Sequence, residues 1–254
     1  MLKFFRRIRQ KLLTEHKFSK YLLYAIGEII LVVIGILLAL QLNTWKETQS
    51  ARAAERSLLE NLHEDLQAAK EQSKGFIARE KEMLSQIILA LGIHPDGQAA
   101  PPEFYSDSLM IGLIWEFESN VPVVNSYAEI KNTGKTSLIR NREIRQKFTN
   151  LELSINALDN LVNDRLTVQQ IRIDDIAEND INLVRFANDP EYFLVADLSR
   201  EPKNEYAEIF KRPKVRNLLA MKLLLTRDVL KTRMRLQQEI EVILGLIEEE
   251  IRAF

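Results

Sequence analysis

Few residue combinations that carry catalysis occur in this sequence. The chain of 254 residues has no cysteine, and its three histidines, His16, His63 and His94, lie far apart along the chain. Thiol catalysis, disulfides and cysteine-ligated zinc are therefore excluded, and a histidine-based catalytic or metal cluster is not expected. Because no Gly-x-Ser-x-Gly motif occurs either, the sequence assigns no catalytic residue, no metal ligand and no cofactor.

Three partial motifs fail on residue type or spacing. The Gly-Lys-Thr at 134–136 is the end of a phosphate-loop motif, but that motif needs a glycine at the position of Glu129. The His-Glu at 63–64 begins a zinc-protease motif whose second histidine would replace Gln67. The acidic residues within 174–180 lack the glycine and spacing of a calcium loop, so they indicate a solvated helix face. Only an undefined pair of carboxylates is left as possible catalytic chemistry.

One long apolar segment, residues 21–42, predicts a transmembrane helix. Its only strongly polar residues are Glu28 and Gln41. A helix of this length measures about 33 Å, compared with about 30 Å for the hydrocarbon core of a bilayer. The expected interfacial anchors are Tyr21, Tyr24 and Trp45. A cleaved signal peptide is the main alternative, but it would have a shorter apolar run and a small-x-small cleavage site.

The basic residues precede this segment and predict its orientation. Residues 1–20 contain one acid, Glu15, and the basic residues Lys3, Arg6, Arg7, Arg9, Lys11, Lys17 and Lys20. The positive-inside rule then keeps residues 1–20 in the cytoplasm and exports residues 43–254. The basic segment is amphipathic, so we expect it both to contact anionic lipid and to set the topology, without being a regulatory lipid site. The remainder is mildly acidic, which argues against nucleic-acid binding.

An acidic residue inside the predicted span indicates a possible contact surface. Glu28, Val32, Gly35 and Ala39 fall on one helical stripe, and Gly35 and Ala39 would let another helix approach closely. Acids within a membrane usually face a partner or water. The alternative is a protonated or snorkelling Glu28 beside small residues that are there by chance.

Helical periodicity dominates the remainder of the chain. Apolar residues with alternating 3- and 4-residue spacing predict long helices over 45–93, from Asn141 to about Arg165, and from Pro213 to the end. Shorter helices are expected after Ser106 and from a capping box at Ser126, with Gly134 ending the latter. The fold class predicted is all-α: one N-terminal transmembrane helix (21–42) followed by an elongated antiparallel helical bundle, similar to a coiled coil (43–254).

Two stretches resemble a bacterial protein family. Residues 4–45, FFRRIRQKLLTEHKFSKYLLYAIGEIILVVIGILLALQLNTW, are similar to the opening of a domain-of-unknown-function family of single-pass membrane proteins from Gram-negative species. Residues 126–141, SYAEIKNTGKTSLIRN, resemble a Tyr-x-Glu-(Ile/Leu)-Lys-x-x-Gly stretch of the same family. The resemblance implies an inner-membrane protein with a periplasmic domain and supplies no activity.

These observations lead to three hypotheses about function. The first is a non-enzymatic, membrane-anchored periplasmic interaction or scaffold protein, which contacts the bilayer and forms a homo-oligomer or joins an envelope complex. The second is a single-pass sensor whose bundle binds a ligand and signals to a cytoplasmic partner; a cavity around Trp115, Phe117 and Tyr127 would favour it. The third is a hydrolase that uses carboxylates, which clustered carboxylates with perturbed pKa values would favour.

Overall fold

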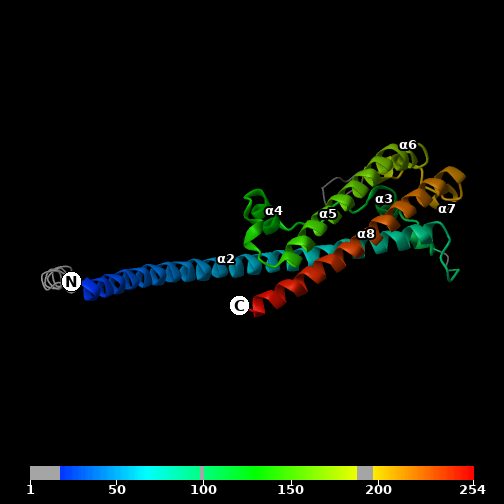
Figure 1. The fold of residues 1–254 in the computed structure, drawn as a ribbon. Coiled ribbons are helices and arrows are strands. Elements are labelled where there is room, and N and C mark those ends of the chain that lie inside the picture. The colour runs from blue at the N-terminus through cyan, green and yellow to red at the C-terminus, as the bar shows by residue number, and fades with distance from the viewer. Residues whose placement is uncertain (1–17, 98–99, 188–196) are drawn as a thin grey trace. The chain divides into compact units, whose positions relative to one another are not determined.

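The computed structural model describes residues 18–97, 100–187 and 197–254, and those residues contain helices and no strand. The all-α prediction is therefore confirmed. The chain divides into two compact units, Met1–Arg56 and Ser57–Phe254, which are described separately below. Figure 1 shows the helices in chain order.

The described part of the first unit, from Phe18 to Arg56, is the beginning of α2 (Phe18–Ala90). Every residue from 29 to 50 is exposed, although 29–42 are almost entirely apolar. Among the described residues, α2 is the one helix long and apolar enough to cross a membrane. No charged residue interrupts it between Glu28 and Lys46, which is why the apolar surface extends around the whole helix.

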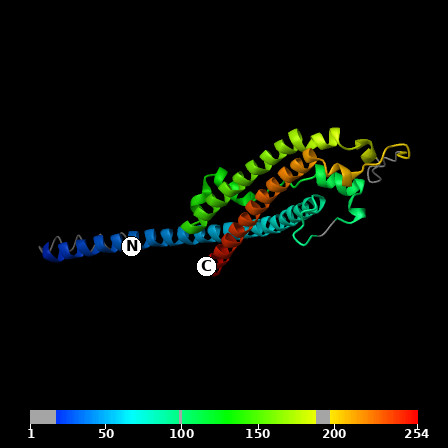
Figure 2. The same ribbon diagram turned by 90° about the vertical axis from the view of Figure 1, so that its right-hand side faces the viewer.

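The second unit is built on three long helices: the part of α2 that follows Arg56, α5 (Arg142–Val168) and α8 (Pro213–Arg252). The helices α5 and α8 begin at the residues that the sequence predicts. The Asn141 side chain accepts hydrogen bonds from the amides of Glu143 and Ile144, and Pro213 occupies the first turn of α8, where its missing N–H costs nothing. Figures 1 and 2 show α5 and α8 side by side.

Contacts between the helices define their directions. Ion pairs join His63 to Glu248, Lys70 to Glu241 and Glu80 to Arg233, so numbering rises along α2 as it falls along α8. The two helices are therefore antiparallel. α5 runs in the direction of α2, because the residues between them return the chain to the start of the bundle (Figure 1).

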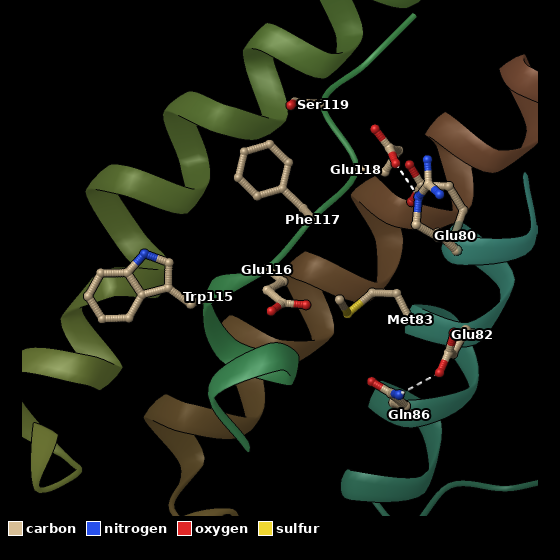
Figure 3. A pocket seen from close by; sticks show the side chains of 10 residues that line it. Glu80, Glu82, Met83, Gln86, Trp115, Glu116, Phe117, Glu118 and Ser119 are labelled. Atoms are coloured by element: carbon tan, nitrogen blue, oxygen red, sulfur yellow. Dashed lines mark hydrogen bonds and ion pairs between the residues drawn. The ribbon is translucent and has the colours of Figure 1, made fainter. Parts of the chain in front are cut away.

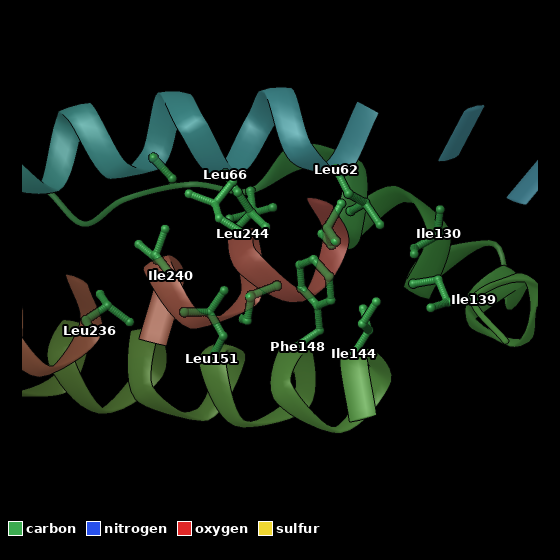
Figure 4. Close-up of a cluster of buried hydrophobic side chains, with 14 of the residues drawn as sticks. Leu62, Leu66, Ile130, Ile139, Ile144, Phe148, Leu151, Leu236, Ile240 and Leu244 are labelled. Atoms are coloured by element: carbon green, nitrogen blue, oxygen red, sulfur yellow. The ribbon is translucent and has the colours of Figure 1, made fainter. Parts of the chain in front are cut away.

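The apolar core follows the predicted helical periodicity. From Leu59 to Ala90, the positions of α2 that keep the alternating 3- and 4-residue spacing are buried, apart from Met83, which is partly exposed. Figure 4 shows Leu62 and Leu66 of α2, Phe148 and Leu151 of α5, and Ile240 and Leu244 of α8 meeting in one cluster. Each such side chain contributes about 1.5–3 kcal/mol by leaving water, which makes this cluster the main support of the bundle.

Shorter elements close the other end of the bundle. They are η1 (Pro102–Phe104), α3 (Asp107–Trp115), α6 (Asp174–Asn179), η4 (Leu183–Ala187) and α7 (Tyr206–Ile209). Ser106 caps α3 as predicted, by accepting a hydrogen bond from the amide of Leu109. A second apolar cluster there includes Ile87, Met110 and Leu219.

A π-helical turn, η3 (Gln169–Ile173), joins α5 to α6. A π turn has more residues than an α turn, so it shifts the helical phase of everything that follows. This shift explains why the apolar periodicity of the sequence weakens after Arg165. The sequence places the end of this less regular run at Asp189-Pro190, which lies outside the described residues.

The helix α4 (Asn125–Asn132) corrects one prediction. No capping box forms at Ser126, because both its amide and its hydroxyl donate to Oδ2 of Asp65, each at 2.7 Å. A carboxylate on α2 thus takes the place of the predicted local cap. The end of α4 is as predicted: Gly134 has a φ of +69°, which glycine adopts readily, and η2 (Lys135–Leu138) follows.

Candidate functional site

Four charged residues are buried in the middle of the bundle. They are Glu80 of α2, Arg165 of α5, and Lys222 and Arg233 of α8, and each exposes between 1% and 3% of its surface. Removing an ion from water costs several kcal/mol unless other groups replace its solvation. We refer to these four residues as the charged layer. Their hydrogen bonds, described next, replace the water that each ion loses on burial.

Glu80 lies between two guanidinium groups. Its carboxylate accepts two parallel hydrogen bonds from Arg165, at 2.7 and 2.9 Å, and one from Nε of Arg233 at 3.1 Å. Parallel pairing of this kind is the strongest arrangement available to arginine and a carboxylate. One acidic side chain of α2 thereby connects all three long helices.

The two arginines also donate hydrogen bonds to backbone carbonyls. The residues 116–124 that follow α3 are not helical. Arg165 donates to the carbonyl of Glu118, and Arg233 donates to the carbonyls of Glu118 and Asn120, at 3.0 and 2.8 Å. The charged layer therefore holds this non-helical segment against the bundle by carbonyl groups that a helix would otherwise satisfy internally.

Lys222 likewise holds backbone carbonyls, at the C-terminal end of α3. Its ammonium donates to the carbonyls of Leu113, Ile114 and Glu116, at 2.7, 2.9 and 2.8 Å. A cation there also complements the negative end of the helix dipole. Burial, and then repulsion from Arg165, lowers the pKa of Lys222 to about 7. Three donated bonds use all three ammonium hydrogens, so this geometry is that of the charged form.

A surface cavity of about 440 Å³ lies over the charged layer. Figure 3 shows its walls: α2 provides Glu80, Glu82, Met83 and Gln86, and the other wall is residues 115–119. Arg79 of α2 also lines the cavity. Trp115 is 45% exposed, and the guanidinium of Arg165 lies 5.3 Å from the ring centre of Phe117. The cavity thus combines aromatic surface with carboxylates, and its lining includes the buried carboxylate of Glu80.

The carboxylate of Glu118, in the cavity wall, is paired with donors. Partial burial of Glu118 disfavours its charge, but hydrogen bonds from the amide of Asn120 and from Arg79 outweigh burial and hold its pKa below the usual range. A carboxylate with a lowered pKa is ionised at neutral pH and does not serve as a general acid. Among the described residues, no group of three or more His, Cys, Asp or Glu side chains could hold a metal ion.

A second, partly buried network joins elements at the far end of the bundle. The carboxylate of Asp107 accepts hydrogen bonds from Tyr206 at 2.6 Å, Arg185 at 2.7 Å and Asn204 at 3.1 Å. Burial opposes ionisation of Asp107, yet these donors lower its pKa, while burial and the adjacent carboxylate raise the pKa of Tyr206. All four groups satisfy one another, so this cluster anchors loops.

The helix α2 also carries the resemblance noted in the sequence. Residues 28–90 match a family of unknown function, DUF6090. The predicted resemblance to a family of unknown function is thus confirmed over this range, which includes Glu28 and Glu80. The family supplies no activity. No curated protein and no solved structure is significantly similar to the chain.

The region matched by the family contains most of the predicted membrane residues. Val32, Gly35 and Ala39 are exposed and Glu28 is partly exposed. A side chain at Gly35 would meet nothing within 4 Å, so the stripe is sterically open in this chain. Its role as a helix contact stays a prediction.

The remaining predicted residues are placed only in part. Trp45 is an exposed residue of α2. Lys20, Tyr21 and Tyr24 belong to the same helix. The basic residues from Lys3 to Lys17 lie outside the described residues.

The structure brings only part of the predicted aromatic cavity together. Trp115 and Phe117 line the cavity, but Tyr127 lies elsewhere, stacked on Phe148 with ring centres 4.5 Å apart. Sequence reasoning missed the charged layer. A partial signal was present, because Glu80 and Arg233 each interrupt a stripe of apolar residues with alternating 3- and 4-residue spacing, but the spacing does not pair them with each other.

Proposed function

We propose that the protein is a non-enzymatic, membrane-anchored interaction protein of the bacterial envelope. The observation that supports this proposal is the complete exposure of residues 29–50, whose first fourteen residues are almost entirely apolar. Apolar surface of this extent is unfavourable in water by about 25 cal/mol per Å², so a bilayer or a partner helix must cover it.

The proposed topology places residues 1–20 in the cytoplasm, the span 21–42 in the inner membrane, and the helical bundle in the periplasm. The basic residues before the span support this orientation through the positive-inside rule. In this arrangement the bundle is a rigid module at the end of a tether, and its outer faces are available to other envelope proteins.

Within the membrane, the proposed contact surface is the stripe Glu28, Val32, Gly35 and Ala39. The partner is a second copy of the chain or another single helix. Small residues let two backbones approach closely, and a carboxyl group that hydrogen-bonds across the interface avoids facing lipid.

Photo-crosslinking in living cells tests this surface. A crosslinking residue at Val32 should capture a specific protein, whereas one at Leu37 should not, because nine residues from Glu28 is about 180° around an α-helix. Both side chains are exposed to the same extent, about 54%. A self-crosslink that Glu28→Leu abolishes would indicate a homo-oligomer, and capture of another protein would indicate an envelope complex. Equal capture at both positions, or capture of lipid alone, would reject the stripe.

A single-pass sensor is the second candidate, favoured by the cavity beside Trp115. Indole rings and the carboxylates of Glu82 and Glu116 suit a small organic cation. Because Trp45 and Trp115 are the two tryptophans of the chain, full-length Trp45→Phe reports on the cavity alone. Spermidine should change its fluorescence in a saturable manner, less so after Glu116→Gln and equally after Glu103→Gln. No saturable change would reject this candidate.

A further inference from the structure

A second cavity, of about 300 Å³, lies on a different face of the bundle, between α4, η2 and the first turns of α5. Six of its lining side chains carry a hydrogen-bond donor: Tyr127, Thr136, Arg142, Arg145, Gln146 and Thr149. No carboxylate lines it. A concave surface with two guanidinium groups and no acid is complementary to an anion.

Several of these donors are unpaired. Among the residues that the structure describes, Arg142 finds no hydrogen-bond or ion-pair partner, and the hydroxyls of Tyr127 and Thr136 find no hydrogen-bond partner. Arg145 is fastened by Nη1, which donates to the carbonyls of Ile139 and of the residue after it. Its Nε and Nη2 are left over, so Arg145 is held in place and can still donate.

The ring of Tyr127 is also fixed before any ligand binds. It stacks on Phe148, with the planes 10° apart, and Phe148 is fully buried in the apolar core. Donors held in position bind an anion with less loss of conformational entropy than mobile surface side chains.

The site does not depend on the amides at the start of α5 or on a phosphate loop. Asn141 already accepts from the amides of Glu143 and Ile144. Of the Gly-Lys-Thr at 134–136, the glycine ends α4 and only Thr136 lines the cavity. The recognition would come from side chains alone.

We propose that this cavity binds a small phosphate-bearing anion, with Arg142 and Arg145 on its oxygens and Thr136 and Tyr127 donating from the sides. Arginine suits this ligand because its planar fork gives two parallel hydrogen bonds to one phosphate group. The site is independent of the membrane stripe and adds a ligand to a protein whose family has none assigned.

Calorimetric titration of the full-length chain in phosphatidylcholine nanodiscs tests the site, with inorganic pyrophosphate as the probe. Arg142→Gln should raise Kd about tenfold to a hundredfold, because it removes charge-assisted hydrogen bonds. The substitution is at an exposed position and should leave the melting temperature unchanged. Arg172→Gln, an exposed arginine of η3 outside the cavity, removes the same charge and should leave Kd unchanged.

Two results would overturn the proposal: no binding of pyrophosphate, or equal weakening by both arginine substitutions. A repeat in nanodiscs that contain phosphatidylglycerol distinguishes the sources of the phosphate. If phosphatidylglycerol weakens pyrophosphate binding to the wild type but not to Arg142→Gln, the lipid headgroup competes for the cavity and is its ligand. Unchanged binding would assign it to a free solute.

Discussion

Two parts of α2 use hydrophobic residues in opposite ways. Residues 29–42 are almost entirely apolar and entirely exposed, whereas residues 59–90 are rich in charge and bury one side. The second part even buries the carboxylate of Glu80. Apolar content alone therefore does not decide what a protein buries; periodicity and the partners available to each side chain decide it.

The largest effect is expected from breaking the charged layer. Glu80→Ala should lower the free energy of unfolding by about 3–5 kcal/mol, because it leaves Arg165 and Arg233 buried without a carboxylate. Thermal unfolding in nanodiscs measures this loss, and Glu82→Gln, an exposed position two residues along α2 in the cavity wall, is the control. Replacing Glu80 and its two arginine partners together, by Glu80→Leu, Arg165→Met and Arg233→Met, should recover only part of the loss, because the carbonyls of Glu118 and Asn120 then lose their donors. A triple variant less stable than Glu80→Ala would mean that the bonds to these carbonyls contribute more than the pairing of the ions.

A matched pair of leucines tests the comparison directly. Leu62→Ala should cost about 2–5 kcal/mol of unfolding free energy, since it opens a cavity in the core. Leu37→Ala makes the same chemical change in the exposed part of α2 and should change the unfolding of the bundle by less than about 0.5 kcal/mol. Similar losses for both would show that the exposed part supports the bundle.

A charge placed in each region tests the membrane assignment. Leu37→Arg should cost about 2.5–3.5 kcal/mol for insertion near the middle of a bilayer, so cell fractionation should recover less protein in the membrane. Leu224→Arg puts the same charge on an exposed position of α8 and should not change the fraction. Full membrane recovery of the Leu37→Arg protein would contradict the predicted span.

The smallest effect expected is a pH dependence from Lys222. Its pKa is about 7 in the folded chain and near 10.5 when solvated, so between these values the unfolded chain binds a proton that the folded chain has released. Stability should therefore rise with pH across this window, by up to about 1.4 kcal/mol per pH unit. Denaturation curves at pH 7.5 and 8.5 should show the rise in the wild type and not in Lys222→Met. If the free energy of unfolding fell with pH in the wild type and not in the variant, the pKa of Lys222 would not be lowered in the folded chain.

Local signals in the sequence predicted most of the fold. Asn141, Pro213 and Gly134 mark helix ends, and each acts through its own backbone or side chain, so no distant partner was needed. Ser126 misled because its preferred acceptor, Asp65, is 61 positions away. The π turn at Gln169 also has no marker in the sequence, apart from the loss of periodicity that it causes.

The charged layer was hidden for the same reason. Glu80 and Arg233 are 153 positions apart, and each alone reads as an interruption of an apolar stripe. Only the register between α2, α5 and α8 pairs them. The cavity beside Trp115 depends on that pairing too, since the carbonyls of its wall are held by Arg165, Arg233 and Lys222.

The contact of Glu80 with two helices has a consequence for the order of assembly. Of the three long helices, α2 is synthesised first and α8 last. The Glu80 carboxylate therefore exists long before Arg233, which donates a hydrogen bond to it. A collapsed intermediate made of α2 and α5 alone would enclose a carboxylate with only part of its partners, which raises its free energy. Closure of the bundle should therefore be cooperative and should wait for its C-terminal helix. Chains truncated before Arg233 should remain open and sensitive to protease.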